Sequence, residues 1–269
     1  MTPLEPFQIF SLAGRVAVVT GGTRGIGRDA AEILALAGAD VAITSRDGRA
    51  AEATAREIAE RASVQTMGLE LDHTEPASVE RATQAVNAWR RSPDILLNNA
   101  GGGSGDTTAE LFERDPEDIK AMLASNLLGP LLCARAFGRA MAERGSGKII
   151  NLSSIAAHVG RDRSIYEGTG MMGQPIDYAA AKGGVSAMTR DLAAWLGPKG
   201  VTVNAISPGG IERDHPEAFV RGYAARTPLG RMARPGFDIA GPILFLASKA
   251  SDYVNGHDLV VDGGFSTWA

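Results

Sequence analysis

The chain has 269 residues, of which 44% are hydrophobic and 22% charged, with 27 Lys and Arg against 31 Asp and Glu. These proportions are typical of globular domains and exclude disordered, collagen-like and disulfide-stapled classes. The net charge of -4, without any run rich in Lys and Arg, argues against nucleic acid as a partner.

The cysteine content, the N-terminal residues and the hydropathy pattern predict the compartment. The lone cysteine, Cys133, has no internal disulfide partner, which favours a reducing compartment, with the cytoplasm as the default. Residues 1–14 carry Glu5 and no basic segment, so we expect no export signal. The longest uncharged apolar stretch, 121–134, is too short to span a bilayer, so no membrane association is expected. No cluster of His, Cys and Asp has the spacing of metal ligands, and we expect no metal.

Short apolar runs alternate along the chain with longer stretches of helical spacing. Strands are predicted at 16–20, 41–44, 65–71, 95–98, 148–152, 201–206 and 259–261. Helices are predicted at 27–37, 49–62, 78–88, 116–143 (in one piece or broken), 178–196 and 239–247. This order predicts an α/β fold with a doubly wound, seven-stranded parallel sheet in a three-layer α/β/α sandwich, as a single domain over 1–269.

Two long stretches, 153–175 and 209–231, are predicted as loops. Both follow predicted strands, and in an open α/β sheet ligands bind beyond the carboxyl ends of the strands. Long loops in compact domains are usually functional, so we expect both to border a substrate site.

A glycine-rich turn joins the first strand to the first helix. It reads Thr20-Gly21-Gly22-Thr23-Arg24-Gly25-Ile26-Gly27. Glycines let the main chain approach phosphate oxygens, and the helix N-terminus supplies free N–H groups and a partial positive charge. The turn therefore favours a dinucleotide site, although a tight strand-to-helix connection has the same pattern.

The motifs jointly resemble the short-chain dehydrogenase/reductase family over nearly the whole chain. The resemblance is carried by the Gly-x-x-x-Gly-x-Gly turn, Asn98-Asn99-Ala100-Gly101, Tyr178-x-x-x-Lys182, Asp72, Asn126, Ser153-Ser154, Pro208-Gly209 and Asp262-Gly263-Gly264. It implies a Rossmann-type fold, a nicotinamide cofactor and a homotetramer or homodimer. The implied cofactor-binding residues are Gly21, Thr23, Arg24, Gly25, Ile26, Gly27, Ser45, Arg46, Asp72, Asn99, Ala100, Gly101, Tyr178, Lys182, Pro208, Gly209 and Ile211.

The end of the second strand bears on the choice of cofactor. NAD sites usually present a carboxylate there to the ribose hydroxyl, whereas a 2′-phosphate requires cations. Alignment with the family places Ser45 at the acidic position, followed by Arg46, and Arg24 lies in the glycine turn. Two guanidiniums can converge on one phosphate, so NADP(H) is favoured over NAD(H). The alternative is that both arginines are ordinary surface residues and Asp47 binds the ribose.

Tyr178 and Lys182 are four residues apart on a predicted helix and share one face. An ammonium near a phenol lowers the phenol's pKa, which suits proton exchange with an alcohol or a nascent alkoxide. The resemblance implies that Lys182 also holds the cofactor ribose, that Ser154 hydrogen-bonds the substrate oxygen and that Asn126 holds a water near the lysine. The predicted activity is interconversion of a ketone and a secondary alcohol by hydride transfer.

The sequence departs from the family pattern in three places. Ser154 and Tyr178 are 24 positions apart, about twice the usual interval, so 160–173 resembles an insertion and Ser153 is the alternative catalytic serine. Arg213 stands where the family has a threonine that binds the nicotinamide carboxamide. The glycine-rich loop 101–105 after the fourth strand is longer than usual.

The substrate is a small carbonyl or alcohol compound of unspecified class. Arg161, Arg163 and Arg213 lie in the two long loops and suit a carboxylate such as a sugar acid, or they are solvated beside Asp162, Glu212 and Asp214. Within the family, reduction of a 3-oxoacyl thioester is the alternative activity. A nucleotide-binding regulator without turnover is the alternative from another functional class, although such proteins typically lose the Tyr or Lys that this chain keeps.

Overall fold

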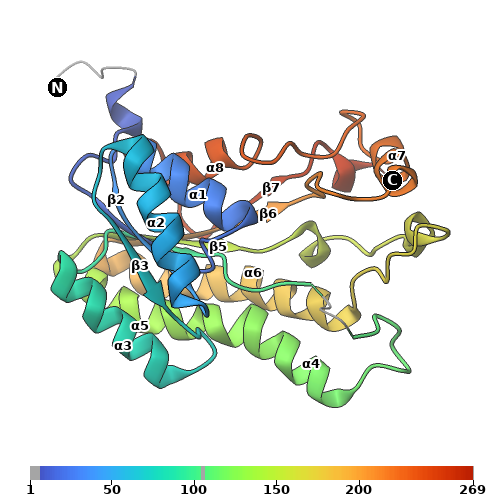
Figure 1. Ribbon diagram of the computed structural model, residues 1–269, viewed down its shortest axis with the longest axis horizontal. Coiled ribbons are helices and arrows are strands. Elements are labelled where there is room, and N and C mark those ends of the chain that lie inside the picture. Colours follow the sequence, from blue (N-terminus) through green and yellow to red (C-terminus); the bar gives the residue numbers. More distant parts are fainter. Residues whose placement is uncertain (1–6, 104–106, 269) are drawn as a thin grey trace.

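The computed structural model describes residues 7–103 and 107–268. Its strands form one parallel sheet in the order β3-β2-β1-β4-β5-β6-β7 (Figure 1). They are β1 (Val16–Val19), β2 (Asp40–Ser45), β3 (Thr66–Glu70), β4 (Ile95–Asn98), β5 (Gly147–Leu152), β6 (Val201–Pro208) and β7 (Asp258–Val261). The predicted Rossmann-type sheet is confirmed, because the strand order reverses direction between β1 and β4, as in doubly wound folds.

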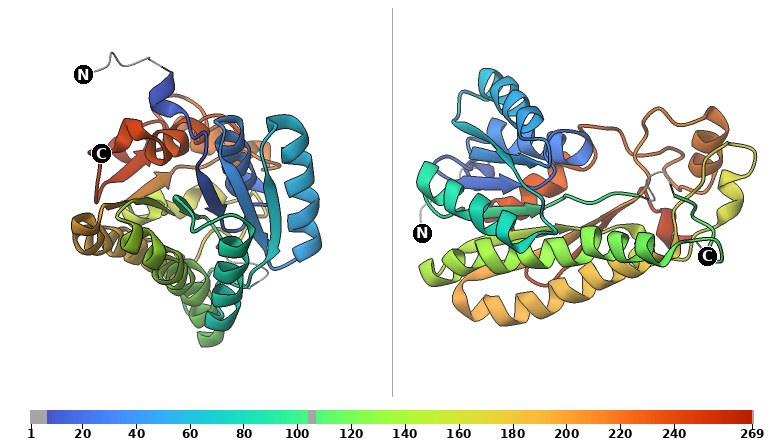
Figure 2. Two further views of the ribbon diagram at one scale, coloured as in Figure 1. Left: turned by 90° about the vertical axis from the view of Figure 1, so that its left-hand side faces the viewer. Right: turned by 60° about the horizontal axis from the view of Figure 1, so that its bottom comes forward.

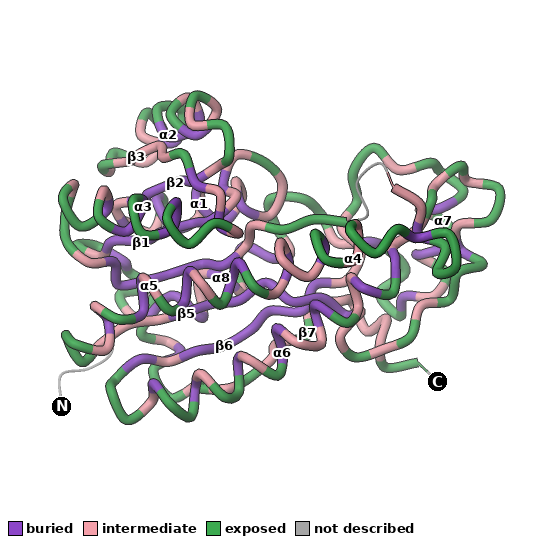
Figure 3. The backbone as a smooth tube through the Cα atoms, turned by 90° about the horizontal axis from the view of Figure 1, so that it is seen from below, coloured by how far each residue is buried: buried purple, intermediate pink, exposed green. Residues whose placement is uncertain are grey.

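Helices cover both faces of this sheet. They are α1 (Gly25–Leu36), α2 (Gly48–Ala62), α3 (Pro76–Trp89), α4 (Pro116–Leu123), α5 (Gly129–Arg144), α6 (Ile176–Leu196), α7 (Glu217–Ala225) and α8 (Ala240–Ala247). Along β1, Ala17 and Val19 pack in one core with α1, α2 and α8, whereas Val16 and Val18 pack in a second core with α3, α5 and α6. Figure 2 shows the two helical layers, and Figure 3 shows the buried strands between them. The period-two alternation of buried residues thus produces the predicted three-layer sandwich.

The long helix predicted at 116–143 is broken in the structure. A π-helical turn, Ala124–Leu128, separates α4 from α5. The Ser125 carbonyl in this turn lies 2.8 Å from His73 Nε2, and Gly129 leaves room for that ring, since a Cβ there would lie 2.1 Å from His73 Cδ2. The whole run Pro116–Arg144 is long and apolar enough to cross a membrane by length and composition alone. Its α5 part lies against the sheet, however, where Phe137 and Met141 are fully buried, which is the packing of a core helix.

The predicted loop 209–231 contains a helix, α7, that the sequence pattern did not reveal. Its two buried side chains, Phe219 and Tyr223, are four residues apart and lie on one face of the helix. They pack instead with Ile165 and Met232 in a small separate core. Hence the two long loops pack together and form one cap beyond the carboxyl ends of the strands. In Figure 1 the first of these loops is the yellow segment, and the second contains α7.

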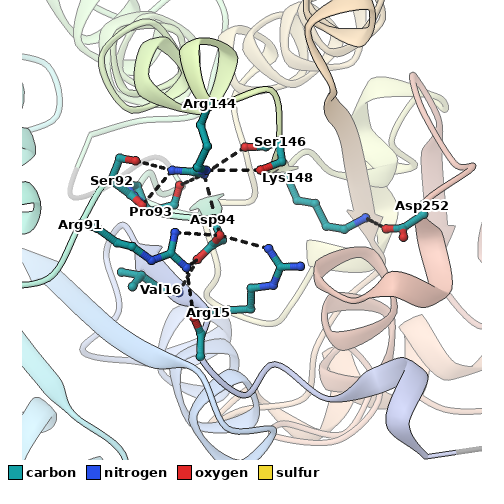
Figure 4. A network of polar contacts seen from close by, with 11 residues as sticks. Arg15, Val16, Arg91, Ser92, Pro93, Asp94, Arg144, Ser146, Lys148 and Asp252 are labelled. Carbon is teal, nitrogen blue, oxygen red and sulfur yellow. Dashed lines mark hydrogen bonds and ion pairs between the residues drawn. The ribbon is translucent and has the colours of Figure 1, made fainter. Parts of the chain in front are cut away.

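The opposite end of the sheet is closed by polar contacts around Asp94 (Figure 4). This carboxylate accepts hydrogen bonds from the Val16 main-chain N–H at 2.8 Å, from Arg15 at 3.1 Å and from Arg91 at 2.7 Å. Because the network joins the starts of β1 and β4, it fixes the sheet end remote from the cap. The ligand-binding end is therefore the opposite one, which is formed by the glycine turn and the cap.

Candidate active site

The cleft at the carboxyl end of the sheet has a volume of about 1430 Å³. That is larger than the roughly 300–1,000 Å³ of most small-molecule sites, so it has room for a dinucleotide beside a substrate. All catalytic and cofactor-binding residues predicted from the sequence line this cleft except Gly27, which lies behind the glycine turn. Ser104 and Gly105 of the glycine-rich loop lie outside the described residues.

The glycine turn has the backbone shape that its composition suggests. Gly21 and Gly25 have φ of +64° and +55°, a region in which side chains are strained. A Cβ on Gly27 would lie 2.2 Å from the Gly21 carbonyl oxygen, so α1 can start this close to the turn only with glycine there. Within the first turn of α1 there is no acidic residue, and Arg24 at its N-cap makes no side-chain capping bond. The N–H groups at this helix start are thereby left for an anionic ligand.

Hydrogen bonds between Asn99, which follows the neighbouring strand β4, and Thr20 hold the turn in place. The Asn99 side-chain amide donates to the Thr20 and Gly21 carbonyls at 2.9 and 3.0 Å. Thr20 Oγ1 accepts from the main-chain N–H groups of Asn99 and Ala100, each at 3.0 Å. The amide of Asn99 therefore braces the cradle.

At the end of β2, Ser45, Arg46 and Asp47 face the cleft together with Arg24. Asp47 Oδ1 accepts a hydrogen bond from the Ala50 N–H at 3.1 Å and caps α2. Neither Arg24 nor Arg46 forms an ion pair with any described residue, so two uncompensated guanidiniums remain at this end. Asp72 also lines the cleft, and hydrogen bonds from Thr74 hold the pKa of its carboxyl below the usual value.

Tyr178, Ser154 and Lys182 meet at the floor of the cleft. Ser154 lies close enough to the Tyr178 hydroxyl to lower that group's pKa, and Ser154 Oγ accepts from the Ala156 N–H at 3.1 Å. Lys182 Nζ donates to the Leu152 carbonyl at 2.8 Å and lies 5.6 Å from the centre of the Tyr178 ring. The predicted helical face is present, because both side chains come from the first two turns of α6.

The electrostatics of the pair differ from the sequence expectation. Burial raises the pKa of Tyr178 above its ordinary value, while the Ser154 hydrogen bond and the Arg161 charge act in the opposite direction. Burial also lowers the pKa of Lys182 to about 8. The pKa of Tyr178 thus shifts in the direction opposite to the sequence expectation, because removal from water outweighs the lowering by Ser154 and Arg161.

Ser153, the alternative serine, faces away from Tyr178. Its hydroxyl donates to the Lys182 carbonyl at 3.0 Å and lies 3.0 Å from Ser186 Oγ. It thereby fixes α6 against β5. Of the two serines, Ser154 is the one that acts on the Tyr178 hydroxyl.

Asn126 lies in the π-helical turn and binds the loop after β4. Its amide donates to the Gly102 carbonyl at 3.2 Å, and its Oδ1 accepts from the Gly102 N–H at 3.2 Å. A Cβ on Gly101 would lie 2.6 Å from that oxygen, and Gly101 has a φ of +148°. The structure thus shows Asn126 shaping this wall of the cleft.

A buried ion pair at the start of α6 was missed by the sequence reasoning. Arg114 Nε lies 2.9 Å from both carboxylate oxygens of Asp177, and their side chains are only 3% and 6% exposed. The guanidinium also donates to the Thr108 carbonyl at 2.7 Å. Because Asp177 precedes Tyr178, this pair fixes the helix start that carries the phenol. Residue spacing gave no signal for it, since the partners are far apart in the sequence.

The cap supplies an apolar wall that the sequence reasoning also missed. Tyr166 stacks on Phe219 with ring centres 5.3 Å apart, and Tyr223 stacks on Phe265 at 4.6 Å. The Tyr223 hydroxyl accepts from the Gly210 N–H at 2.5 Å, and burial raises the pKa of this tyrosine to about 12. Tyr223 is thus a wall residue with a neutral hydroxyl. The insertion is tied to α7 by Arg226, which donates to Asp162 at 2.7 Å.

The three loop arginines predicted to meet a substrate are separated in the structure. Arg163 is exposed and donates to the Gln174 carbonyl at 3.5 Å, at the edge of the geometric range. Arg161 lines the cleft and acts electrostatically on Tyr178. Arg213 instead reaches the glycine turn, where its guanidinium lies over Gly25. Only Arg161 of the three faces the phenol.

A Rossmann sheet with a glycine cradle, uncompensated cations and a Ser–Tyr–Lys floor defines a nicotinamide-nucleotide-dependent oxidoreductase. The residues fit such a cofactor because the turn leaves no room for a Cβ at Gly27 and leaves the start of α1 uncapped. Among the described residues, no group of three His, Cys, Asp or Glu has the arrangement of a metal site.

Comparison with known proteins agrees with this class. Residues 21–266 match a family model described as enoyl-(acyl carrier protein) reductase. A 3-oxoacyl-[acyl-carrier-protein] reductase from Aquifex aeolicus is 37% identical over 94% of this chain and 98% of its own. Cyclohexanol dehydrogenase from a Rhodococcus species is 39% identical, over 95% and 97% respectively.

The solved structures give the same result. A gluconate 5-dehydrogenase from Burkholderia cenocepacia, solved with NADP and tartrate, superposes with a TM-score of 0.88 at 34% identity, over 98% of this chain and 99% of that one. The chain belongs to the short-chain dehydrogenase/reductase family, and it is an oxidoreductase that acts on alcohol or ketone substrates with a nicotinamide cofactor.

Proposed function

We propose that this protein is an NADP(H)-dependent carbonyl reductase or secondary-alcohol dehydrogenase in which Tyr178 exchanges the proton. The observation that carries the proposal is the meeting of Ser154 and Tyr178 on the cleft floor, one helical turn from buried Lys182. When bound, the nicotinamide supplies or accepts the hydride, and the protein supplies position and proton transfer.

Each residue has a role that follows from its surroundings. The raised pKa of Tyr178 keeps the phenol protonated at neutral pH, which suits donation of its proton to the oxygen of a carbonyl that is being reduced. Ser154, whose side chain acts on the Tyr178 hydroxyl, orients the substrate oxygen beside it. Lys182 holds the cofactor ribose from the buried side of α6, and Asn126 keeps the loop at Gly101 clear of the site.

The preference for NADP(H) rests on the end of β2. Arg46 and Arg24 form no ion pair with any described residue, although the Arg46 charge acts on the Asp72 carboxyl, and Asp47, the carboxylate that would serve NAD, caps α2 through Oδ1. A 2′-phosphate is therefore attracted there, and no carboxylate stands at position 45, where the Ser45 hydroxyl accepts from the Asp47 N–H at 3.1 Å. The NADP held by the Burkholderia structure supports the same choice.

Absorbance at 340 nm with a panel of ketones and 3-oxoacyl thioesters, using NADPH and NADH in parallel, tests the proposal. We expect oxidation of NADPH with at least one ketone and a kcat/KM at least tenfold higher with NADPH than with NADH. Equal use of both nucleotides would refute the role of Arg46. A lack of turnover across the panel, with nucleotide binding retained, would favour the regulator instead.

Arg161 favours a substrate with a carboxylate, as in a sugar acid. It is the cleft arginine whose charge acts on Tyr178, and it forms no ion pair within the described ranges. A keto acid and its uncharged methyl ester form the test pair. We expect Arg161→Met to lower kcat/KM for the acid roughly tenfold or more and to leave the ester unchanged, since a charged hydrogen bond contributes about 1.5–3 kcal/mol. The exposed Arg163→Met is the matched control, and an equal loss for acid and ester would remove this candidate.

The assembly is proposed from an apolar groove on α5 and α6. Leu131 and Trp195, which are 41% and 64% exposed, line it. Exposed apolar surface of this kind marks contact sites, so we propose a homotetramer or homodimer packed through these helices. Light scattering after gel filtration is expected to give a multimer that Trp195→Glu dissociates; an unchanged mass would place the interface elsewhere.

Free, buried Cys133 supports a cytoplasmic location.

A further inference from the structure

Arg213 projects from the loop after β6 onto the glycine turn. A Cβ built on Gly25 would lie 2.6 Å from Arg213 Nη2, 3.1 Å from Cζ and 3.2 Å from Nη1. The three distances together place the whole guanidinium against the main chain of Gly25, at the first residue of α1. This contact joins two segments that border the cleft from opposite sides.

The turn before Arg213 is ordered by its own hydrogen bonds. Ile211 forms a β-bridge with Ala233, and the Glu212 N–H donates to the Ala233 carbonyl at 2.8 Å. The Arg213 N–H donates to His215 Nδ1 at 3.1 Å, and the His215 N–H donates to the Arg213 carbonyl at 2.7 Å. The guanidinium is therefore aimed by main-chain geometry, although the side chain as a whole is exposed.

The charge of Arg213 is not neutralised by the protein. Neighbouring arginines of the cap are paired: Arg226 with Asp162, and Arg231 with Asp238. Arg213 forms no ion pair within residues 7–103 and 107–268, although Glu212 and Asp214 flank it in the sequence. An unpaired guanidinium over a glycine turn can bind an anionic ligand.

The anion that belongs at this position is a diphosphate. In Rossmann sites the pyrophosphate lies at the N-terminus of the first helix, against the glycine turn. We propose that Arg213 is a diphosphate-binding residue, which closes the cap loop over the cofactor where the family pattern has a carboxamide-binding threonine. The assignment rests on the proposed dinucleotide function and adds a residue that no motif predicted.

One consequence concerns the cap. The His215 ring contacts Phe219 with centres 5.2 Å apart, and Phe219 belongs to the apolar wall of the substrate end. A diphosphate held by Arg213 therefore steadies the segment that carries this wall. Cofactor binding and the order of this wall are thereby linked through one turn.

Binding of three nucleotide fragments, measured by calorimetry at fixed salt, tests the proposal without turnover. ADP-ribose carries only the diphosphate, adenosine 2′-monophosphate only the 2′-phosphate, and 2′-phospho-ADP-ribose both. We expect Arg213→Met to weaken ADP-ribose and 2′-phospho-ADP-ribose about tenfold, equivalent to about 1.4 kcal/mol. Adenosine 2′-monophosphate is expected to bind this variant within twofold of the wild type.

Arg46→Met is the matched control and should give the reverse pattern, with ADP-ribose unaffected and both 2′-phosphorylated fragments weakened. Equal effects of Arg213→Met on all three fragments, or no effect, would overturn the assignment. Tighter binding of ADP-ribose would also overturn it, because the guanidinium would then be competing for the phosphate position. Failure of the wild type to bind any fragment would refute the dinucleotide function itself, whereas failure at Arg213 alone leaves that function standing.

Discussion

Replacing Arg114 by methionine tests how the start of α6 is held. The substitution keeps an unbranched apolar stem but removes the guanidinium, which leaves the Asp177 carboxylate 6% exposed and without its cation. Breaking a buried pair from one side costs about 3–5 kcal/mol, because a charge remains out of water. The Thr108 carbonyl also loses its donor at 2.7 Å, so we expect the upper half of this range.

A double-mutant cycle separates the pair from its surroundings. Arg114→Met and Asp177→Leu are each expected to lower the free energy of unfolding, and the double variant is expected to lose at least ~2 kcal/mol less than their sum. Urea titrations followed by circular dichroism at one protein concentration give these values. In thermal scans the Arg114→Met variant should melt lower by roughly 8–20 °C, at about 2–4 °C per kcal/mol.

The exposed pair Arg221–Glu217, whose side chains are 67% and 82% exposed, supplies the control. Arg221→Met should change stability by less than about 1 kcal/mol, as surface pairs do. If Arg114→Met fell in that same small range, the pair would not be holding α6, and the account of how Tyr178 is positioned would be wrong.

Three further predictions follow from the site. Burial lowers the pKa of Lys182 to about 8 from 10.5, so between these values the unfolded chain binds more protons than the folded one and stability rises with pH, by roughly 3 kcal/mol in all. Urea titrations at pH 7.5 and 10 should show this rise in the wild type and not in Lys182→Met; equal rises would assign it to another group. Gly27→Ala, whose Cβ would lie 2.2 Å from the Gly21 carbonyl oxygen, should abolish nucleotide binding and destabilise the fold. As a control, Gly222→Ala in α7 should stabilise the fold by about 0.5–1 kcal/mol. If Gly27→Ala retained nucleotide binding, the glycine turn would not be the phosphate-binding site. Arg46→Asp should shift the ratio of kcat/KM from NADPH toward NADH, and an unchanged ratio would show that the 2′-phosphate binds elsewhere.

Much of the frame was predictable because its signals are local. Four-residue apolar runs such as Val16–Val19 mark strands buried on both faces, and the glycine turn marks the start of α1. The spacing of Tyr178 and Lys182 placed both on one helical face, as found. Short-range periodicity is sufficient for features of this kind.

The remainder depends on contacts between distant segments. Nothing local to 209–231 distinguishes α7 from a loop, because Phe219 packs on an inserted segment and not on the sheet. The same holds for Arg114 with Asp177, and for Arg213, which a family pattern placed at the carboxamide and which lies at Gly25. The direction of the pKa shift at Tyr178 was missed because burial, which spacing does not reveal, exceeds the lowering by Ser154 and Arg161.

The most direct test of the catalytic assignment is Tyr178→Phe, which removes one hydroxyl and keeps the ring. Ketone reduction should fall at least ~100-fold in kcat, the smaller end of what a general acid contributes. NADPH binding, followed by fluorescence titration of the same preparation, should stay within about twofold of the wild type. A variant that binds NADPH and retains more than a tenth of its turnover would show that another group donates the proton.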